Sequence, residues 1–340
     1  MKSLLVLLLT LFSVSTLLAL GPTIPGMSPA EVDFGPRPAE NELIIYSIPA
    51  PRQLVWKNPR RLLGTFMSNY AMAKESKGGT HCIGHVFMGL NVGGREILAG
   101  MTTQDHTEDQ QLMKKRGYGL GIIGADMLGR LQTTEQLKKE IPWLCKNERF
   151  GYIRYKISPE MGQRLMQYYD EYVAKGCDKH YGGMNRPRYG EGGGCSAFGV
   201  SFLEVAGLVK EEHFANWTIN VRIPEKLYGG PHTGRHISMA ELAALGPFAG
   251  NWAKEDEPHI KCFMWEPTLM YLWILNQWNE GNGRPTKGMR AESFGSAFGI
   301  VVDETEAPVP TEDIWLCPES NPNPYGWQPG IYWSEQSETD

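Results

Sequence analysis

Beyond its N-terminal segment the chain has no long hydrophobic run, and no run of lysine or arginine is long enough to form a basic patch. The formal net charge is -5, from 33 Lys and Arg against 38 Asp and Glu. Binding to nucleic-acid phosphates needs a basic surface, so this balance argues against a general nucleic-acid-binding protein. The 340 residues also contain no internal repeat and no long linker. We therefore expect one large domain, or a catalytic domain with a C-terminal extension.

The N-terminus differs from the rest of the chain. Lys2 precedes an apolar run over residues 4–18, and Ala19-Leu20-Gly21 follows it. A positive start, a short apolar stretch and small residues at its exit are typical of a secretory signal peptide. We expect residues 1–21 to be removed and the protein to be secreted or periplasmic, with no stable membrane span. An uncleaved membrane anchor is the alternative, although the run is short for a bilayer.

Cysteine is scarce, and one cysteine stands apart. The six are Cys82, Cys145, Cys177, Cys195, Cys262 and Cys317. In an oxidising compartment six cysteines can pair as disulfides. Cys195, however, follows three glycines and opens an apolar run, Phe198 to Leu208, that predicts a helix. A helix start favours the thiolate, so we expect Cys195 to be an unpaired, reactive thiol. A second cysteine must then be unpaired, and we expect Cys82 to be that buried thiol, within a strand.

A histidine upstream offers the partner that such a cysteine needs. His85 lies in Gly84-His85-Val86-Phe87-Met88-Gly89-Leu90, which predicts a short buried strand. A cysteine hydrolase requires a thiolate, a base, a group that orients the base, and donors for the oxyanion. Cys195 and His85 supply the first two, and the backbone N–H of Cys195 is a candidate oxyanion donor. We expect the orienting group on the next strand, 95–101, or just after it. The candidates there are Glu96, Gln104 and His106.

Strand and helix patterns are mixed along the chain, which predicts an α+β fold with an antiparallel sheet packed on helices. The predicted strands are 43–46, 80–90, 95–101, 152–157 and 217–223. The predicted helices are 58–74, 133–144, 159–175, 195–207, 238–245 and 267–278. The polar stretch 102–116 and the glycine-rich stretch 117–124 are expected to be loops. From Pro308 onward we expect an irregular segment.

The order of these elements resembles a known family. A Gly-His strand is followed by a paired strand (96–100), a strand–helix unit (152–175), a loop containing tyrosine, and Gly-Cys-Ser-Ala-Phe. This resembles the circularly permuted papain-like cysteine hydrolases of the NlpC kind, which include the lecithin retinol acyltransferase branch. The family's cysteine helix commonly starts Asn-Cys-x-x-Phe. Here Gly194 replaces the asparagine, while Cys195 and Phe198 match. The resemblance covers roughly residues 79–208.

The resemblance implies a permuted papain-like core with Cys195 as nucleophile and His85 as base. It divides the chain into an N-terminal segment (22–75), a catalytic core (76–215) and a partly irregular C-terminal extension (216–340). It implies no cofactor. The expected activity is hydrolysis or transfer of an acyl group from an amide, thioester or ester. A peptide, a peptidoglycan-like molecule or an acyl lipid would be the substrate.

Two alternatives compete with this interpretation. The first is a metal site, since His81 and His85 are four residues apart and Cys177 and His180 three apart. No second pair of cysteines completes a zinc set, so we expect no metal. On a strand, an offset of four would instead place His81 beside His85. The second alternative is an exported binding protein of the same fold, stapled by disulfides and without catalysis.

Overall fold

The computed structural model describes most of the chain after residue 40. The described residues are 41–75, 81–105, 107–147, 149–245, 250–281, 288–294 and 297–317. The predicted signal peptide and the candidate His106 lie outside them, so secretion stays a prediction. Among the described segments, no helix is both long enough and apolar enough to cross a membrane.

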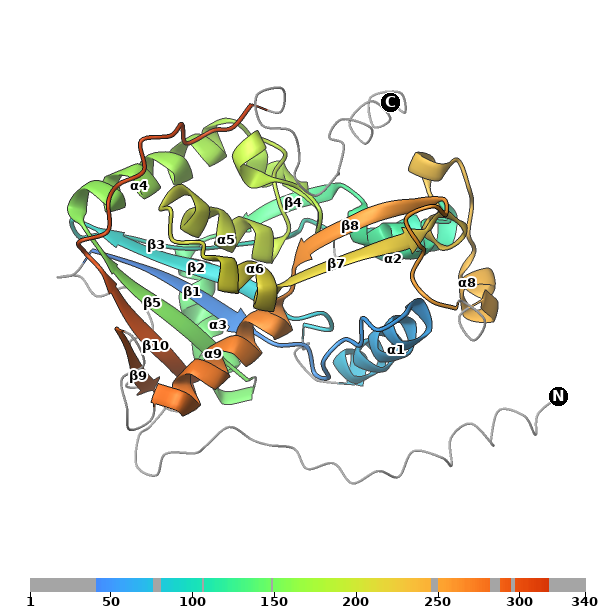
Figure 1. Ribbon diagram of the computed structural model, residues 1–340, viewed down its shortest axis with the longest axis horizontal. Helices are drawn as coiled ribbons and strands as arrows, with labels where there is room; N and C mark the ends of the chain where they lie inside the picture. Colours follow the sequence, from blue (N-terminus) through green and yellow to red (C-terminus); the bar gives the residue numbers. More distant parts are fainter. Residues whose placement is uncertain are drawn as a thin grey trace.

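A large sheet forms the centre of the molecule (Figure 1). Its strands are β1 (Glu42–Ile48), β2 (His85–Val92), β3 (Arg95–Thr103), β4 (Met127–Gln132), β5 (Gly151–Ile157), β6 (His180–Tyr181), β9 (Met289–Phe294) and β10 (Ala297–Glu304). The eight strands lie in the order β6-β4-β3-β2-β1-β5-β10-β9. All neighbours are antiparallel except β5 and β10, which are parallel. The predicted α+β class with a mainly antiparallel sheet is confirmed.

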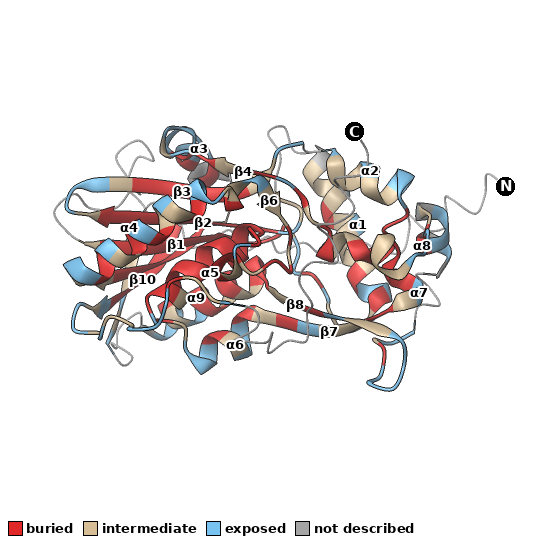
Figure 2. Ribbon diagram, turned by 90° about the horizontal axis from the view of Figure 1, so that it is seen from above, coloured by how far each residue is buried: buried red, intermediate tan, exposed pale blue. Residues whose placement is uncertain are grey.

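Helices cover both faces of this sheet, with α3 on one and α4, α5 and α9 on the other (Figures 1 and 2). Their bounds are α3 (Thr134–Asn147), α4 (Pro159–Ala174), α5 (Cys195–Val205) and α9 (Pro267–Gly281). Successive residues of β2 point to opposite faces of the sheet. Val86 therefore packs in the apolar core between the sheet and α5, and Phe87 packs in the apolar core between the sheet and α3. Burial on both faces explains why β1 and β2 are almost continuously apolar.

A smaller group of elements lies beyond one end of the sheet (Figure 1). It comprises α1 (Pro59–Glu75), α2 (Glu108–Lys115), α7 (Glu225–Tyr228) and α8 (Met239–Leu245). The antiparallel ribbon of β7 (Thr218–Pro224) and β8 (His259–Trp265) reaches into this group, and the short helix α6 (Glu211–Trp217) precedes β7. Leu62, Leu227, Tyr228, Leu242 and Cys262 belong to its separate apolar core.

Some local predictions were wrong. The stretch 102–116 is not all loop, because it contains α2. That helix buries no residue, so no apolar stripe marked it in the sequence. The glycine-rich stretch contains a 3₁₀ helix, Gly119–Gly124, mostly buried against α7. Cys82 is not in a strand: it lies half-buried in a turn that precedes β2.

The sheet also extends beyond the predicted catalytic core of residues 76–215. Strand β1 comes from the predicted N-terminal segment and pairs with β2 and β5. Strand β10 comes from the predicted C-terminal extension and continues the sheet beside β5. Both flanks of the chain therefore contribute to one sheet.

Candidate active site

The glycines before Cys195 allow the start of α5 to pack tightly on the preceding loop. At Gly192 (φ +70°) a side chain would lie 2.5 Å from the carbonyl oxygen of His180. Gly194 is extended and donates its N–H to the Gly182 carbonyl oxygen at 2.7 Å. Glycine is therefore needed in this turn, both for its backbone conformation and for space. The turn fixes Cys195 as the first residue of the helix.

A further glycine brings α5 close to the sheet. Gly199 lies one turn after Cys195, and a Cβ there would approach Cγ1 of Val86 to 2.8 Å. Because Gly199 has no side chain, α5 packs directly against β2 at this point. The backbone N–H of Val86 donates to the sulfur of Cys195.

His85, the first residue of β2, lies beside that sulfur. Its ring is hydrogen-bonded to Cys195, and its Nε2 is 3.1 Å from Oε1 of Gln132. Both members of the pair are buried, with 5% of Cys195 and 6% of His85 exposed. The structure therefore brings together the two principal residues predicted from the sequence.

The neighbours of this pair favour its charged form. Burial raises the pKa of the Cys195 thiol, but the charge and hydrogen bond of His85, together with the hydrogen bonds of Val86 and Tyr181, bring the net pKa below its ordinary value. Burial likewise lowers the pKa of His85, but Cys195, the Gln132 hydrogen bond and the charge of Glu140 raise it above its ordinary value. Both shifts favour a thiolate beside an imidazolium.

Gln132 is the orienting group, and it comes from a strand that we did not predict. It ends β4, on the far side of β3 from β2, and lies opposite Gly100 in the strand register. A Cβ on Gly100 would lie 2.9 Å from Oε1 of Gln132 and 3.5 Å from Nε2 of His85. The Gln132 side chain thus reaches His85 by crossing over β3 at Gly100, where no side chain blocks its path. Its Nε2 donates to Oε2 of Glu140 at 3.1 Å.

For Glu96 and Gln104 the expectation of an orienting role is therefore corrected, and for His106 it stays a prediction. Gln104 is exposed, and its backbone N–H donates to the Leu128 carbonyl oxygen at 2.8 Å. Glu96 forms an ion pair with Lys138 on α3. Within the described ranges, neither side chain contacts His85 or Cys195. His106 lies outside those ranges.

Tyr181, which the sequence did not single out, completes the surroundings of the sulfur. Its hydroxyl is hydrogen-bonded to the sulfur and to the backbone N–H of Cys195. Burial, together with the charge of Cys195, raises the pKa of Tyr181 well above its ordinary value, so the hydroxyl keeps its proton. Two groups that can donate to an oxyanion, the hydroxyl and the Cys195 N–H, thus lie beside the sulfur; in this structure the N–H donates to the hydroxyl and the hydroxyl to the sulfur.

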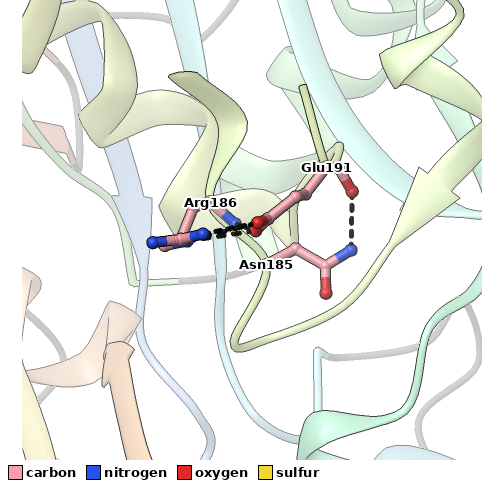
Figure 3. A network of polar contacts seen from close by, with 3 residues as sticks. All are labelled: Asn185, Arg186 and Glu191. Carbon is pink, nitrogen blue, oxygen red and sulfur yellow. Dashed lines mark hydrogen bonds and ion pairs between the residues drawn. The ribbon is translucent and has the colours of Figure 1, made fainter. Parts of the chain in front are cut away.

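A polar network holds the loop that carries Tyr181. His180 Nδ1 is 3.0 Å from Asp126, and Asn185 Nδ2 donates to Asp126 at 3.1 Å. Asn185 also donates to the Glu191 carbonyl oxygen at 2.8 Å, and Arg186 forms an ion pair with the Glu191 carboxylate at 2.8 Å (Figure 3). The described residues contain no cluster suited to a metal ion. The His180 side chain is used in holding the loop.

His81 lies over the same site. Its ring stacks on that of His85, with centroids 4.6 Å apart and an interplanar angle of 8°. The turn of Gly84 (φ +80°), whose N–H donates to the His81 carbonyl oxygen, folds His81 back onto β2. Burial and the charge of His85 lower the pKa of His81 to about 3, so its ring is neutral. The expected proximity of the two histidines is present, through a turn rather than a continuous strand.

Cys195 is a free thiol, as are Cys82, Cys177 and Cys262. The disulfides stay a prediction.

Comparison of the chain with protein-family models, with curated proteins and with solved structures found no match. The argument for function therefore rests on the residues of the site.

Proposed function

We propose that this protein is an exported cysteine hydrolase or acyltransferase, with Cys195 as nucleophile and His85 as its acid and base. The observation that carries the proposal is the buried Cys195–His85 pair, whose hydrogen bonds favour the thiolate. A histidine on a strand that precedes, in the chain, a cysteine at the first position of a helix also supports the permuted papain-like order. Export is supported by the signal-like N-terminus alone.

In the proposed reaction, the Cys195 thiolate attacks the carbonyl carbon of an amide, thioester or ester. A carbon–sulfur bond forms, and the carbonyl oxygen becomes an oxyanion that the Tyr181 hydroxyl and the Cys195 N–H stabilise. His85 gives its proton to the leaving group as the carbonyl regains its double bond. Water or another acceptor then attacks the thioester and loses a proton to His85, and the thiolate is released.

A cleft lies beside the nucleophile helix and supports an organic substrate, although Cys195 and His85 themselves do not line it. Its volume is about 330 Å³, and Gly183 and Ala197 line it next to the active-site turn and helix. Phe214, Phe263 and Trp265 form part of its wall. Aromatic walls with a few polar groups are typical of clefts that bind organic ligands.

Acyl transfer to Cys195 can be tested with p-nitrophenyl acetate. The proposal predicts release of p-nitrophenol together with an acetyl thioester on Cys195, located by mass spectrometry of a peptic digest. Cys195→Ala should lose the adduct, whereas Cys262→Ala should keep it. If p-nitrophenol release by the unmodified protein does not depend on Cys195, or acetylation is equal in both variants, the proposal is refuted.

A further inference from the structure

The side-chain amide of Gln132 has two ends of nearly equal size and opposite chemistry. The Nε2 end donates to Oε2 of Glu140, and the Oε1 end lies 3.1 Å from Nε2 of His85. An ionised carboxylate can only accept hydrogen bonds, so Glu140 must take the amino end of the amide. The carbonyl end is left facing His85.

This orientation determines which nitrogen of His85 carries a hydrogen. A carbonyl oxygen only accepts, so Nε2 of His85 must be the donor in both the neutral and the protonated ring. In the neutral ring, Nδ1 then has a free lone pair for the Cys195 proton. If the amide were reversed, its amino group would donate to Nε2, and the hydrogen would move to Nδ1. That form cannot take the thiol proton.

Helix α3 is attached to the strand that Gln132 crosses. Thr134, its first residue, accepts a hydrogen bond from the Leu98 N–H at 3.0 Å and donates to the Leu98 carbonyl oxygen at 3.3 Å. Leu98 is two residues before Gly100 on β3, the point at which Gln132 passes. Glu140 lies further along the same helix, so this attachment holds its carboxylate beside the amide.

We propose that Glu140 is a positioning residue that holds the Gln132 amide with its oxygen toward His85 and thereby fixes the His85 tautomer that accepts the Cys195 proton. This role rests on the proposed function of the Cys195–His85 pair. The Glu140 charge also raises the pKa of His85, but the side chain is exposed, so this effect is screened. Its direct hydrogen bond to Gln132 carries the effect.

The test compares Glu140→Gln with Glu135→Gln, which removes the same charge from an exposed position on the same helix. Alkylation of Cys195 by iodoacetamide is followed against pH by mass spectrometry. Since one hydrogen bond is worth about 1 kcal/mol, Glu140→Gln should slow alkylation at neutral pH about three- to tenfold, and Glu135→Gln less than about twofold. If the two variants give the same dependence of the Cys195 alkylation rate on pH, the proposal is overturned.

Two further readouts separate positioning from a general structural effect. In a Gln132→Ala background, the effect of Glu140→Gln should fall to the small part that the Glu140 charge exerts on His85, because the amide is gone. In a Cys195→Ala background, ¹⁵N NMR should place the hydrogen of neutral His85 on Nε2, and Glu140→Gln should produce both tautomers. An undiminished effect without Gln132, or an unchanged tautomer, contradicts the role of Glu140. Failure of the proposed function is a different result, in which the unmodified protein releases p-nitrophenol from p-nitrophenyl acetate no faster than Cys195→Ala does.

Discussion

Cys195 begins α5 beside the large sheet, whereas Cys262 lies within β8, in the apolar core of the smaller group of elements. Both side chains are buried. Burial alone raises the pKa of Cys262 to about 12, while His85, Val86 and Tyr181 bring the pKa of Cys195 below its ordinary value. The difference shows that polar neighbours, rather than depth of burial, decide in which direction the pKa of a buried thiol shifts.

The largest expected effect comes from making the surroundings of Cys195 resemble those of Cys262. His85→Phe removes the imidazolium while keeping a ring in the site. With burial then unopposed by His85, the pKa of Cys195 should rise, and alkylation at neutral pH should fall on the order of 100-fold. The measurement is the iodoacetamide rate at Cys195 by mass spectrometry. His236→Phe, at an exposed histidine, is the control, and equal rates in the two variants would contradict the account.

A smaller effect is expected from Gly100→Ala. The added methyl group would lie 2.9 Å from Oε1 of Gln132 and must displace it from His85. Acetylation by p-nitrophenyl acetate should slow about tenfold, because the base is less well oriented. Losing the Gln132 hydrogen bond lowers the pKa of His85. As the pH is raised, the activity of Gly100→Ala should therefore begin to fall at a lower pH than the activity of the unmodified protein.

The matched control for that substitution is Gly64→Ala on α1. A Cβ at Gly64 meets no atom within 4 Å, so this variant should leave the rate and its pH dependence unchanged. If Gly100→Ala behaves like Gly64→Ala, the orienting role of Gln132 is wrong.

The smallest expected effect on the active site comes from Cys262 itself. Cys262→Ser places a hydroxyl in an apolar core, which should cost about 1–3 kcal/mol of unfolding free energy if the hydroxyl finds no partner. Acetylation of Cys195 should not change. Urea unfolding compared with Cys262→Ala, which adds no polar group, measures the cost. A loss of acetylation in folded Cys262→Ser would show that the two regions are coupled.

Local signals in the sequence were sufficient for the elements that carry the pair. Ser158 and Pro159 predicted the start of α4, and the Ser158 hydroxyl indeed accepts from the Met161 N–H at 3.1 Å. The glycines before Cys195 and the apolar run after it predicted α5. These signals lie within a few residues of each other, and one sequence is enough to detect them.

The third residue could not be predicted in the same way. Gln132 ends a strand with weak alternation, in which Leu128 is 48% exposed, so β4 had no clear pattern. Its contact with His85 depends on the register of three strands and on a glycine in the middle one. Tyr181 is positioned by a loop whose network joins Asp126, Asn185 and Glu191. Such contacts arise only from the assembled sheet.

The most direct test of the central claim is the pH at which the alkylation rate of Cys195 is half-maximal in the folded protein. The account predicts a midpoint below the ordinary pKa of a thiol, with Cys262 unlabelled in the same sample throughout the neutral range. A midpoint for Cys195 at or above that ordinary value would mean that His85 does not stabilise the thiolate, and the catalytic pair would be refuted.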